Sequence, residues 1–555
     1  MKWTILSATA VAALICTVTG CTQASANKGE RRGDGQPDCE MVASSAEAIA
    51  MTAQGLVGGY LSEGVYTYKG IPYAKADRFM PPEPPDSWGD GVRSSRAYGP
   101  VCPQPQRDGW KNDEQAFAFG WDDGYAGEDC LRLNIWTRGV ADGARRPVMV
   151  WIHGGGYSTG SSQELPCYDG TNLARNHDVV VVSINHRLNV LGFLDLSYYG
   201  EKYADSGNVG LLDLVAALRW VNTNIEAFGG DPSNVTLFGQ SGGGGKISAL
   251  LATPSAAGLF HKAIIQSGPA LRVMENKYSR RIGKATIEEL GIDPLQVDKI
   301  KDVPYDELVA AGERAIARVR AEIPGGEVPL GFGWAPVVDG KTLPSHPFYP
   351  NAPQQSRDIP LLIGTTLHEF TVSAYVPMMR TASQEQAVEF MRLRFGQRTD
   401  DLVEAFGKAY PGYKPKDLID TDMLLRPIAI EQADIKTAQG GAPVYMYLFA
   451  WESPVLDTLY RSTHCLDIPF VTDNASRHNT LTGGGPAADA LAKKMSAAWV
   501  SFARTGNPNT PVLPHWDAYT TGGKATMIFD NQCRLSYGHD KELMEIAMDF
   551  PLNGF

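Results

Sequence analysis

The sequence predicts an α/β fold, in which helices cover both faces of a large, mostly parallel central sheet. Three observations lead to this prediction. Several short runs are almost continuously apolar and rich in β-branched residues, which is typical of strands buried on both faces. One long segment repeats its apolar residues every three and four positions, as an amphipathic helix does. Because strands and helical segments alternate, we expect parallel pairing with helical crossovers.

The expected strands, in chain order, are residues 148–152, 179–184, 235–238, 263–265, 360–363 and 444–449. The helical repeat lies between the second and third strands, and its apolar positions are Leu211, Leu214, Val215, Leu218, Val221, Ile225 and Phe228. This segment is long enough for a crossover connection. The chain has no internal repeat, and no linker-like stretch divides it after residue 45.

Composition indicates a folded globular protein. Of the 555 residues, 43% are hydrophobic and 20% are charged, which argues against disorder. This length allows either one large domain or two domains. The net charge is −12 and no basic cluster occurs, so we expect no nucleic-acid partner.

The N-terminal region predicts export. Residues 1–20 read as a signal peptide, because their apolar stretch is too short for a membrane span. Residues 18–21 resemble a bacterial lipobox, which favours lipidation of Cys21 and a possible membrane tether; ordinary secretory cleavage after residues 24–26 is the alternative. Residues 21–44 are expected to form a flexible polar tether. Both readings imply export. The protein is expected to be a lipoprotein of the bacterial cell envelope, or to lie in the periplasmic or extracellular space.

The pentapeptide Gly239-Gln240-Ser241-Gly242-Gly243 lies directly between an expected strand and a helix-like stretch. A serine on such a turn takes strained backbone angles, which only small neighbours tolerate. Its hydroxyl is then exposed at the carboxyl end of the sheet, and the following N–H groups face whatever it attacks. This pattern predicts that Ser241 is a nucleophile.

A second glycine motif, His153-Gly154-Gly155-Gly156, follows the expected strand at 148–152. Three glycines at a strand end let backbone N–H groups converge without side chains between them. Such a loop suits the oxyanion of a tetrahedral intermediate. Together with the serine turn, it favours a catalytic role over that of a simple tight turn.

A nucleophilic serine needs a base, and the base needs an orienting carboxylate. His464 follows the late strand at 444–449, and Glu369 follows the strand at 360–363. The resulting order of serine, acid and histidine is typical of α/β-hydrolases. His368, directly beside Glu369, is a rival base that the residues alone leave open.

The chain resembles the type-B carboxylesterases, the cholinesterase-like branch of the α/β-hydrolases, from about Gly55 to its C-terminal region. The matching stretches are residues 68–74, 78–82, 128–135, 185–194, 224–232, 258–263, 336–340 and 499–503. So many blocks in one order are highly specific. The resemblance implies the α/β-hydrolase fold and a single catalytic domain over residues 45–555.

The resemblance also implies roles for individual residues. It makes Ser241 the nucleophile, Glu369 the orienting acid and His464 the base. The oxyanion donors that it implies are the N–H groups of Gly155, Gly156 and Gly242. It further implies a disulfide between Cys102 and Cys130 that closes a loop over the active-site entrance.

Cysteine spacing gives no sign of a metal site. The cysteines after residue 21 are Cys39, Cys102, Cys130, Cys167, Cys465 and Cys533, and none has the paired close spacing of zinc ligands. We therefore expect neither a metal nor a cofactor. The pairing of the four cysteines other than Cys102 and Cys130 stays open, although Cys167 or Cys533 could partner Cys465.

Three positions depart from the family pattern. Gln240 replaces the usual glutamate beside the nucleophile, which removes a negative charge and weakens any case for a cationic choline ester. Gly242 replaces the usual alanine, which makes the turn more pliable. Cys465 stands where glycine normally follows the catalytic histidine.

The sequence thus predicts a serine hydrolase that cleaves carboxylic esters through an acyl-enzyme intermediate. An amidase or carbamate hydrolase with the same residues is one alternative, and a non-catalytic cholinesterase-like binding protein is another. The substrate, a small-molecule or polymeric ester, is not determined by these residues. Aromatic side chains that could line a gorge are Trp110, Trp121, Tyr125, Phe332, Trp334 and Tyr375.

Overall fold

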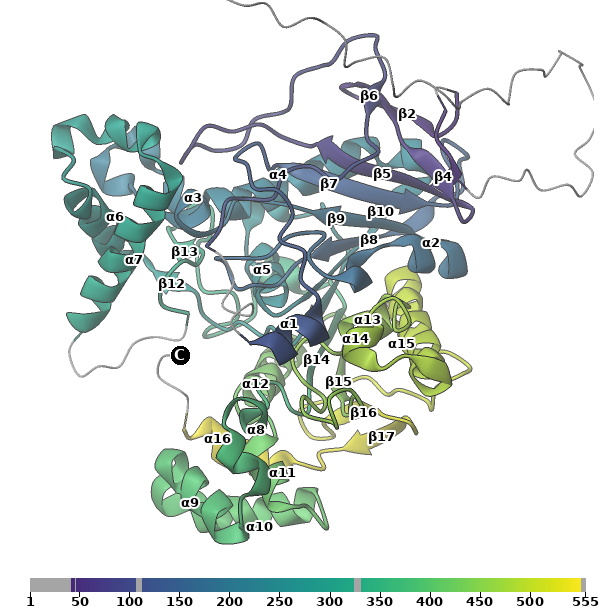
Figure 1. Ribbon diagram of the computed structural model, residues 1–555, viewed down its shortest axis with the longest axis vertical. Helices are drawn as coiled ribbons and strands as arrows, with labels where there is room; N and C mark the ends of the chain where they lie inside the picture. The colour runs from purple at the N-terminus through teal and green to yellow at the C-terminus, as the bar shows by residue number, and fades with distance from the viewer. Residues whose placement is uncertain (1–40, 45, 106–111, 324–330, 551–555) are drawn as a thin grey trace, which may run out of the picture. The chain divides into compact units, whose positions relative to one another are not determined.

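The computed structural model describes residues 41–44, 46–105, 112–323 and 331–550. Within these ranges a 12-stranded sheet runs in the order β1-β4-β5-β7-β9-β8-β10-β11-β14-β15-β16-β17. Neighbouring strands from β9 to β16 in this order are all parallel, and antiparallel strands extend the sheet at both ends. The structure therefore has the large, mostly parallel sheet that the sequence predicts (Figure 1).

The bounds of the elements are as follows. The strands are β1 (Met41–Val42), β2 (Ile49–Thr52), β3 (Gly55–Gly58), β4 (Tyr60–Ser62), β5 (Val65–Pro72), β6 (Arg93–Ser94), β7 (Arg132–Thr137), β8 (Arg146–Ile152), β9 (Val180–Ile184), β10 (Gly230–Gln240), β11 (Lys262–Gln266), β12 (Met274–Glu275), β13 (Val337–Val338), β14 (Leu361–Thr366), β15 (Val444–Phe449), β16 (Ala525–Phe529) and β17 (Arg534–Tyr537). The helices are α1 (Asp113–Phe119), α2 (Thr171–His177), α3 (Asn189–Phe193), α4 (Val209–Asn224), α5 (Gly242–Leu251), α6 (Asn276–Glu289), α7 (Tyr305–Ala321), α8 (Val372–Tyr375), α9 (Gln384–Phe395), α10 (Thr399–Ala409), α11 (Pro415–Asp420), α12 (Leu425–Ala438), α13 (Ile468–Val471), α14 (Asn479–Thr482), α15 (Gly485–Thr505) and α16 (Lys541–Met548).

All six expected strands form, as β8, β9, β10, β11, β14 and β15. The expected helix also forms, as α4, and its last turn continues as a 3₁₀ helix over Ile225–Phe228. β10 begins earlier than expected because Gly230 also pairs with Arg146 of β8, before a register shift between Gly230 and Val235. The apolar runs therefore marked the apolar part of each strand, and buried polar or glycine residues such as Gly364, Thr365 and Thr366 extend β14 beyond its run.

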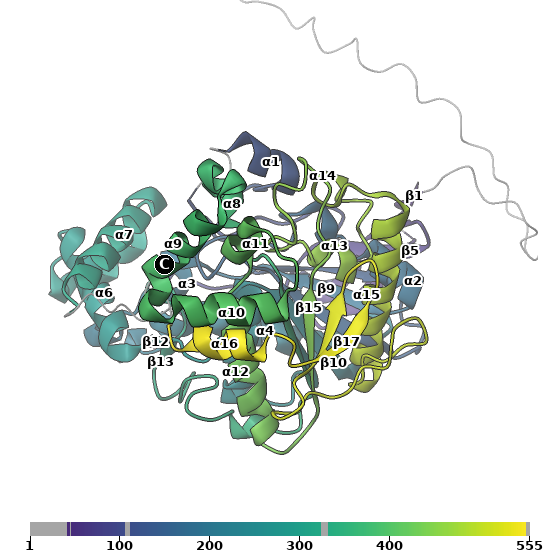
Figure 2. The same ribbon diagram turned by 90° about the horizontal axis from the view of Figure 1, so that it is seen from below.

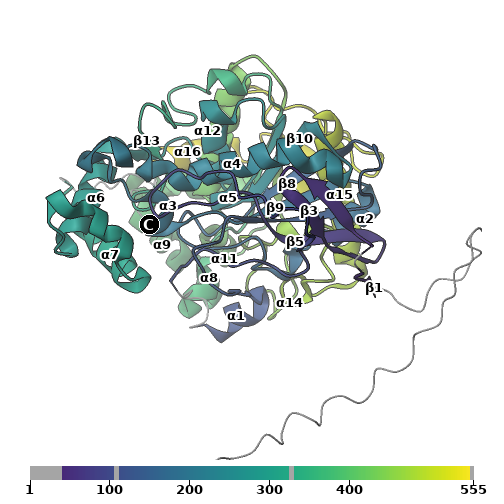
Figure 3. The same cartoon turned by 90° about the horizontal axis from the view of Figure 1, so that it is seen from above.

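Alternate residues of the parallel strands enter two separate hydrophobic cores. In β8, Val148, Val150 and Ile152 join a core that includes residues of α4, α5 and α12. Met149 and Trp151 join a second core with residues of α2, α13 and α15. Because successive side chains of a strand point to opposite faces, helices cover both faces, as predicted. In Figure 1, α13 and α15 lie on one side of β14 and β15, and α12 lies on the other; the α6–α7 pair lies at the margin of the molecule, beyond α3 (Figures 1, 2 and 3).

The antiparallel strands were not expected from the sequence, because polar residues interrupt them. β7 is fully buried although it contains Arg132, Asn134 and Thr137. The Asn134 side chain donates to the hydroxyls of Ser162 (3.1 Å) and Ser183 (3.0 Å). Hydrogen bonds of this kind offset the cost of burying polar groups, and apolar patterning does not reveal them.

By their contacts, residues from Met41 onward group into one unit. The predicted signal peptide, Cys21, Cys39 and most of the predicted tether lie outside the described residues. In the described part of the chain, no helix is both long and apolar enough to cross a membrane.

Candidate active site

Ser241 occupies a strained turn between β10 and α5. Its backbone angles are φ 56° and ψ −127°, an unfavourable region for a residue with a side chain. The flanking glycines are required because the Ile152 carbonyl of β8 lies against them: a β-carbon would meet this oxygen at 2.6 Å on Gly239 and at 2.0 Å on Gly243. The turn is further fixed by the Ser241 N–H, which donates to the Gln266 carbonyl (2.8 Å). The local geometry is that expected of a nucleophile turn.

Glu369 and His464 lie in direct contact. The Glu369 carboxylate follows β14 and is fully buried, and its Oε2 lies 2.5 Å from His464 Nδ1. Its other oxygen accepts the Thr366 N–H (2.8 Å), and the His464 N–H donates to the Glu369 carbonyl (2.8 Å). With the carboxylate on this side, the Nδ1 atom carries the proton and Nε2 presents its lone pair to the serine turn.

The Nε2 atom of His464 contacts the Gln240 side-chain amide (3.2 Å) rather than the hydroxyl of the neighbouring Ser241. In the described ranges no hydrogen bond joins the Ser241 hydroxyl to His464. The Gln240 Oε1 atom in turn accepts the thiol proton of Cys465 (3.2 Å). The structure therefore brings Glu369 and His464 together, and it places Gln240, rather than Ser241, against His464.

The rival base, His368, is turned away from this pair. Its ring is buried and its Nδ1 lies 3.2 Å from the Ser462 hydroxyl. Burial holds the pKa of His368 well below its usual value, and the nearby Arg461 and Lys416 charges add to the effect. Of the two histidines, it is His464 whose ring contacts the Glu369 carboxylate.

The three predicted oxyanion residues lie beside the serine turn. Gly155 and Gly156 have positive φ angles of 77° and 59°. The Gly155 carbonyl is directed into the following turn, where it accepts the N–H groups of Ser158 and Thr159. A β-carbon on Gly242 would meet the Gly156 carbonyl at 2.2 Å, so the absence of the family's alanine allows this close approach.

Lys246 was missed by the sequence analysis. It lies on α5, is 1% exposed, and donates to the carbonyls of His153 (2.9 Å) and Gly154 (3.4 Å) at the base of the glycine loop. Burial lowers the pKa of Lys246 to about 7, while the nearby Glu164 opposes that shift. The signal in the sequence was a lysine within an otherwise apolar helical run.

Two further carboxyl groups lie near Glu369. Burial raises the pKa of Asp467 to about 6, although the Tyr447 hydroxyl (2.7 Å) and the Gln266 amide (3.0 Å) donate to it. Burial, with the charge of Glu369, also raises the pKa of Asp422. Three buried carboxyl groups therefore lie close together, and their burial disfavours the charged forms of Asp467 and Asp422.

The five cysteines of the described residues are free thiols: Cys102, Cys130, Cys167, Cys465 and Cys533. Cys102 and Cys130 are both buried and interact with each other, and this contact and burial raise the pKa of the Cys130 thiol. The structure therefore brings this pair together, but the disulfide implied by the resemblance is not formed in it.

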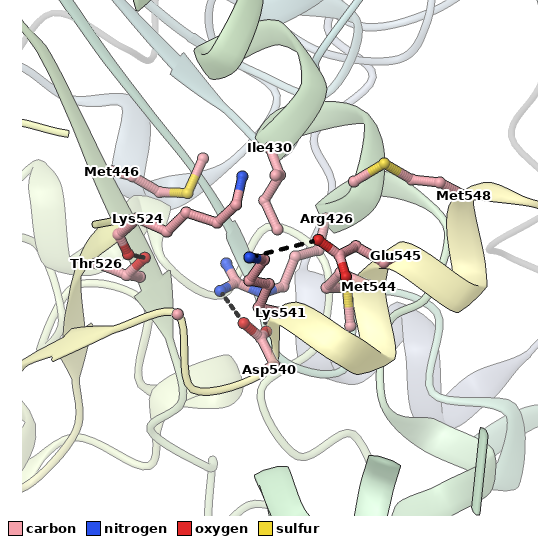
Figure 4. Close-up of a pocket in the computed structure, with 11 residues that line it drawn as sticks. Arg426, Ile430, Met446, Lys524, Thr526, Asp540, Lys541, Met544, Glu545 and Met548 are labelled. Atoms are coloured by element: carbon pink, nitrogen blue, oxygen red, sulfur yellow. Dashed lines mark hydrogen bonds and ion pairs between the residues drawn. The ribbon is translucent and has the colours of Figure 1, made fainter. Parts of the chain in front are cut away.

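One cavity borders the proposed base, and a second lies away from the site. A cavity of about 550 Å³ is lined mainly by apolar residues of α9 and the segment before α12, and by Phe370, whose ring centroid lies 5.1 Å from that of His464. A far smaller cavity of about 20 Å³ lies beside the buried Arg426–Asp540 ion pair (Figure 4). None of the predicted catalytic residues lines the small cavity.

The aromatic residues considered for a gorge differ in their burial. Phe332 and Trp334 are buried in the hydrophobic core, whereas Tyr125 and Tyr375 are 66% and 48% exposed. Trp121 stacks on Phe119 with ring centroids 4.7 Å apart. Trp110 lies outside the described residues. Among the described residues, no group of three histidine, cysteine or acidic side chains could hold a metal ion.

Comparisons with known proteins identify the family of the chain. Residues 46–546 match the profile of the carboxylesterase family. The chain is 37% identical to the para-nitrobenzyl esterase of Bacillus subtilis, over 91% of this chain and 99% of that protein. It is 36% identical to the phenmedipham hydrolase of Pseudarthrobacter oxydans, over 87% and 95% of the two chains. A solved esterase from Clostridium hathewayi, which hydrolyses aliphatic aromatic polyesters, is 39% identical with a TM-score of 0.80, over 90% of this chain and 98% of its own.

Proposed function

The chain belongs to the carboxylesterase family and is a carboxylic ester hydrolase, and from this premise we propose that it is a serine esterase that forms an acyl-enzyme on Ser241. The observation that carries the proposal is the contact between Glu369 and His464, beside the strained turn that holds Ser241. Because the family match identifies an enzyme, the alternative of a non-catalytic binding protein is set aside.

In the proposed mechanism, His464 Nε2 takes the Ser241 proton as the hydroxyl oxygen attacks the ester carbonyl carbon. Glu369 holds the proton on Nδ1 and stabilises the imidazolium that forms. The protonated imidazole then gives its proton to the leaving alcohol. In the second half-reaction His464 takes a proton from water as the water oxygen attacks the acyl carbon. The bond from that carbon to the Ser241 oxygen then breaks, His464 returns the proton to this oxygen, and the acid leaves.

The N–H groups of Gly155, Gly156 and Gly242 are proposed to bind the oxyanion. The positive φ angles of the loop glycines and the close approach of Gly156 to Gly242 support this role. In the described part of the chain, the N–H groups of Gly155 and Gly156 donate no backbone hydrogen bond. Losing one such donor typically raises the barrier by about 2.7–4 kcal/mol.

The test is to replace Ser241 with alanine and measure hydrolysis of a short chromogenic ester and labelling by a fluorophosphonate. We expect Ser241→Ala to lose both, because no hydroxyl remains to be acylated. Ser233→Ala, at the exposed start of the same strand, is the matched control and should keep both. Undiminished turnover in Ser241→Ala would overturn the nucleophile assignment. A matched ester and amide of one acyl group then separate an esterase from an amidase.

We also propose that the protein is exported and tethered through a lipidated Cys21, and that Cys102 and Cys130 become a disulfide after export. The buried, adjacent positions of the two thiols support the second part. The mass of the mature protein purified from its natural host tests both parts: it reports the first residue, any attached lipid and, after alkylation, the number of free thiols.

A further inference from the structure

Two of the three positions that depart from the family pattern contact each other and the proposed base. Gln240 is the last residue of β10, and Cys465 directly follows His464 in the chain. The thiol of Cys465 donates to Gln240 Oε1, and Gln240 Nε2 lies against His464 Nε2, both at 3.2 Å. The carboxamide thus joins the thiol to the imidazole.

Only one arrangement of hydrogens satisfies all these contacts. A thiol is a weak donor and weak acceptor, so its proton goes to the amide oxygen. The amide N–H₂ group is then directed at the imidazole, and it can donate only if Nε2 carries no proton. Since Nδ1 keeps its proton and donates a hydrogen bond to Glu369, this is the neutral imidazole with the proton on the nitrogen that catalysis requires.

The conformation of Cys465 is costly. Its φ angle is 72°, in the left-handed region that favours glycine and is unfavourable for a cysteine. Burial raises the pKa of its thiol well above the usual value, so the thiol keeps the proton that it donates. A strained, half-buried cysteine in contact with a side chain that touches the base indicates a role for the pair.

We propose that Gln240 and Cys465 are positioning residues that hold His464 neutral and oriented between turnovers, and release Nε2 to the Ser241 hydroxyl when acylation begins. This inference rests on the proposed function, because it takes His464 to be the base. The substrate-free ring is then held in place by an amide rather than by the serine. The carboxamide must rotate or withdraw before each acylation.

Acidic groups surround the pair and the ring. Glu369 and Asp467 face His464, and Asp422 lies near Glu369. Glu164, Cys167, Asp467 and Glu369 face the Cys465 thiol. When the ring is protonated, its Nε2–H meets the amide N–H₂ group, donor against donor. The amide must then turn over and exchange the bond from the thiol for a weak N–H···S bond, so the pair favours the neutral imidazole.

The experiment measures the acid limb of kcat/KM for a naphthyl ester between pH 4.5 and 9. Gln240→Glu has the same shape but places a carboxylate against Nε2, and a charge this close typically shifts a titration by about one unit or more. We expect its acid limb to move to higher pH by that amount. Cys465→Ala should move the limb in the same direction by about half a unit, the equivalent of one modest hydrogen bond. Cys465→Ser, which keeps a donor, should restore the wild-type midpoint.

A double variant tests whether the thiol acts through the amide. Gln240→Leu/Cys465→Ala should match Gln240→Leu alone, because no amide remains for the thiol to orient. Cys533→Ala, which removes a thiol donating to the Asp530 carbonyl, is the control and should leave the midpoint unchanged. An unchanged limb in Gln240→Glu, or equal limbs in Cys465→Ala and Cys465→Ser, would overturn the inference.

The failure of this inference is distinguishable from the failure of the proposed function. If Ser241→Ala abolishes turnover while the variants at 240 and 465 leave the acid limb unchanged, the esterase mechanism stands and the positioning role fails. If Ser241→Ala remains active, the proposed function fails instead. Thermal melting of every variant confirms that the compared proteins are folded.

Discussion

Gly268 supports the nucleophile turn from the neighbouring strand end, and replacing it with alanine should displace Ser241. A β-carbon at Gly268 would lie 1.9 Å from the Ser241 carbonyl oxygen and 2.9 Å from Gly244 Cα. Since real contacts of a β-carbon essentially never fall below 3.0 Å, one of the two backbones must move by roughly 1 Å. A misplacement of about 1 Å at a catalytic group can cost roughly 100-fold in rate, or about 2.7 kcal/mol of barrier.

We therefore expect Gly268→Ala to lower kcat by roughly two orders of magnitude while KM changes little, because the ester still binds but the hydroxyl is misaligned. The assay combines steady-state hydrolysis of a chromogenic ester with active-site titration, so that unfolded protein is not counted as slow enzyme. Gly522→Ala, where nothing lies within 4 Å of the added carbon, is the matched control. A Gly268→Ala enzyme with wild-type kcat per titrated site would refute the steric argument.

Three other substitutions test the surroundings of the triad. Glu369→Gln should lower kcat by about 10⁴-fold with little change in folding, because the amide no longer enforces the imidazole tautomer; a small loss would count against Glu369. Lys246→Met leaves two loop carbonyls without their donor, so kcat should fall by roughly 5- to 150-fold, the equivalent of about 1–3 kcal/mol. The control is Lys436→Met, at a buried lysine outside the site, which should leave kcat unchanged. Burial raises the pKa of Asp467 to about 6 in the folded protein, so the native state binds this proton more tightly than the unfolded chain does. The free energy of unfolding should therefore fall as pH rises from about 4 to 6, by about 3 kcal/mol for a shift of this size. Asp467→Asn should remove this fall in stability, which denaturant unfolding at pH 4.5 and pH 8 measures. If the wild-type protein and Asp467→Asn showed the same change in unfolding free energy between these pH values, the burial of Asp467 would not be costly.

The sequence by itself determined the parallel core of the sheet and the turn of the nucleophile. β8, β9, β10, β11, β14 and β15 could be predicted because strands buried on both faces need continuous apolar runs. The serine turn could be predicted because its requirement is local: small residues must flank a strained backbone between a strand and a helix. The resemblance to a known family then extended this local pattern to the acid, the base and the glycine loop.

Only the tertiary structure decided what meets at the base. Spacing along the chain left His368 and His464 as rivals, and packing settled which ring contacts Glu369. The contact between Gln240 and Cys465 joins residues 225 positions apart, and no periodic pattern encodes such a pairing. Buried polar groups, such as the lysine beneath the glycine loop, follow the same rule: their cost is offset by partners from distant strands, which only the folded chain supplies.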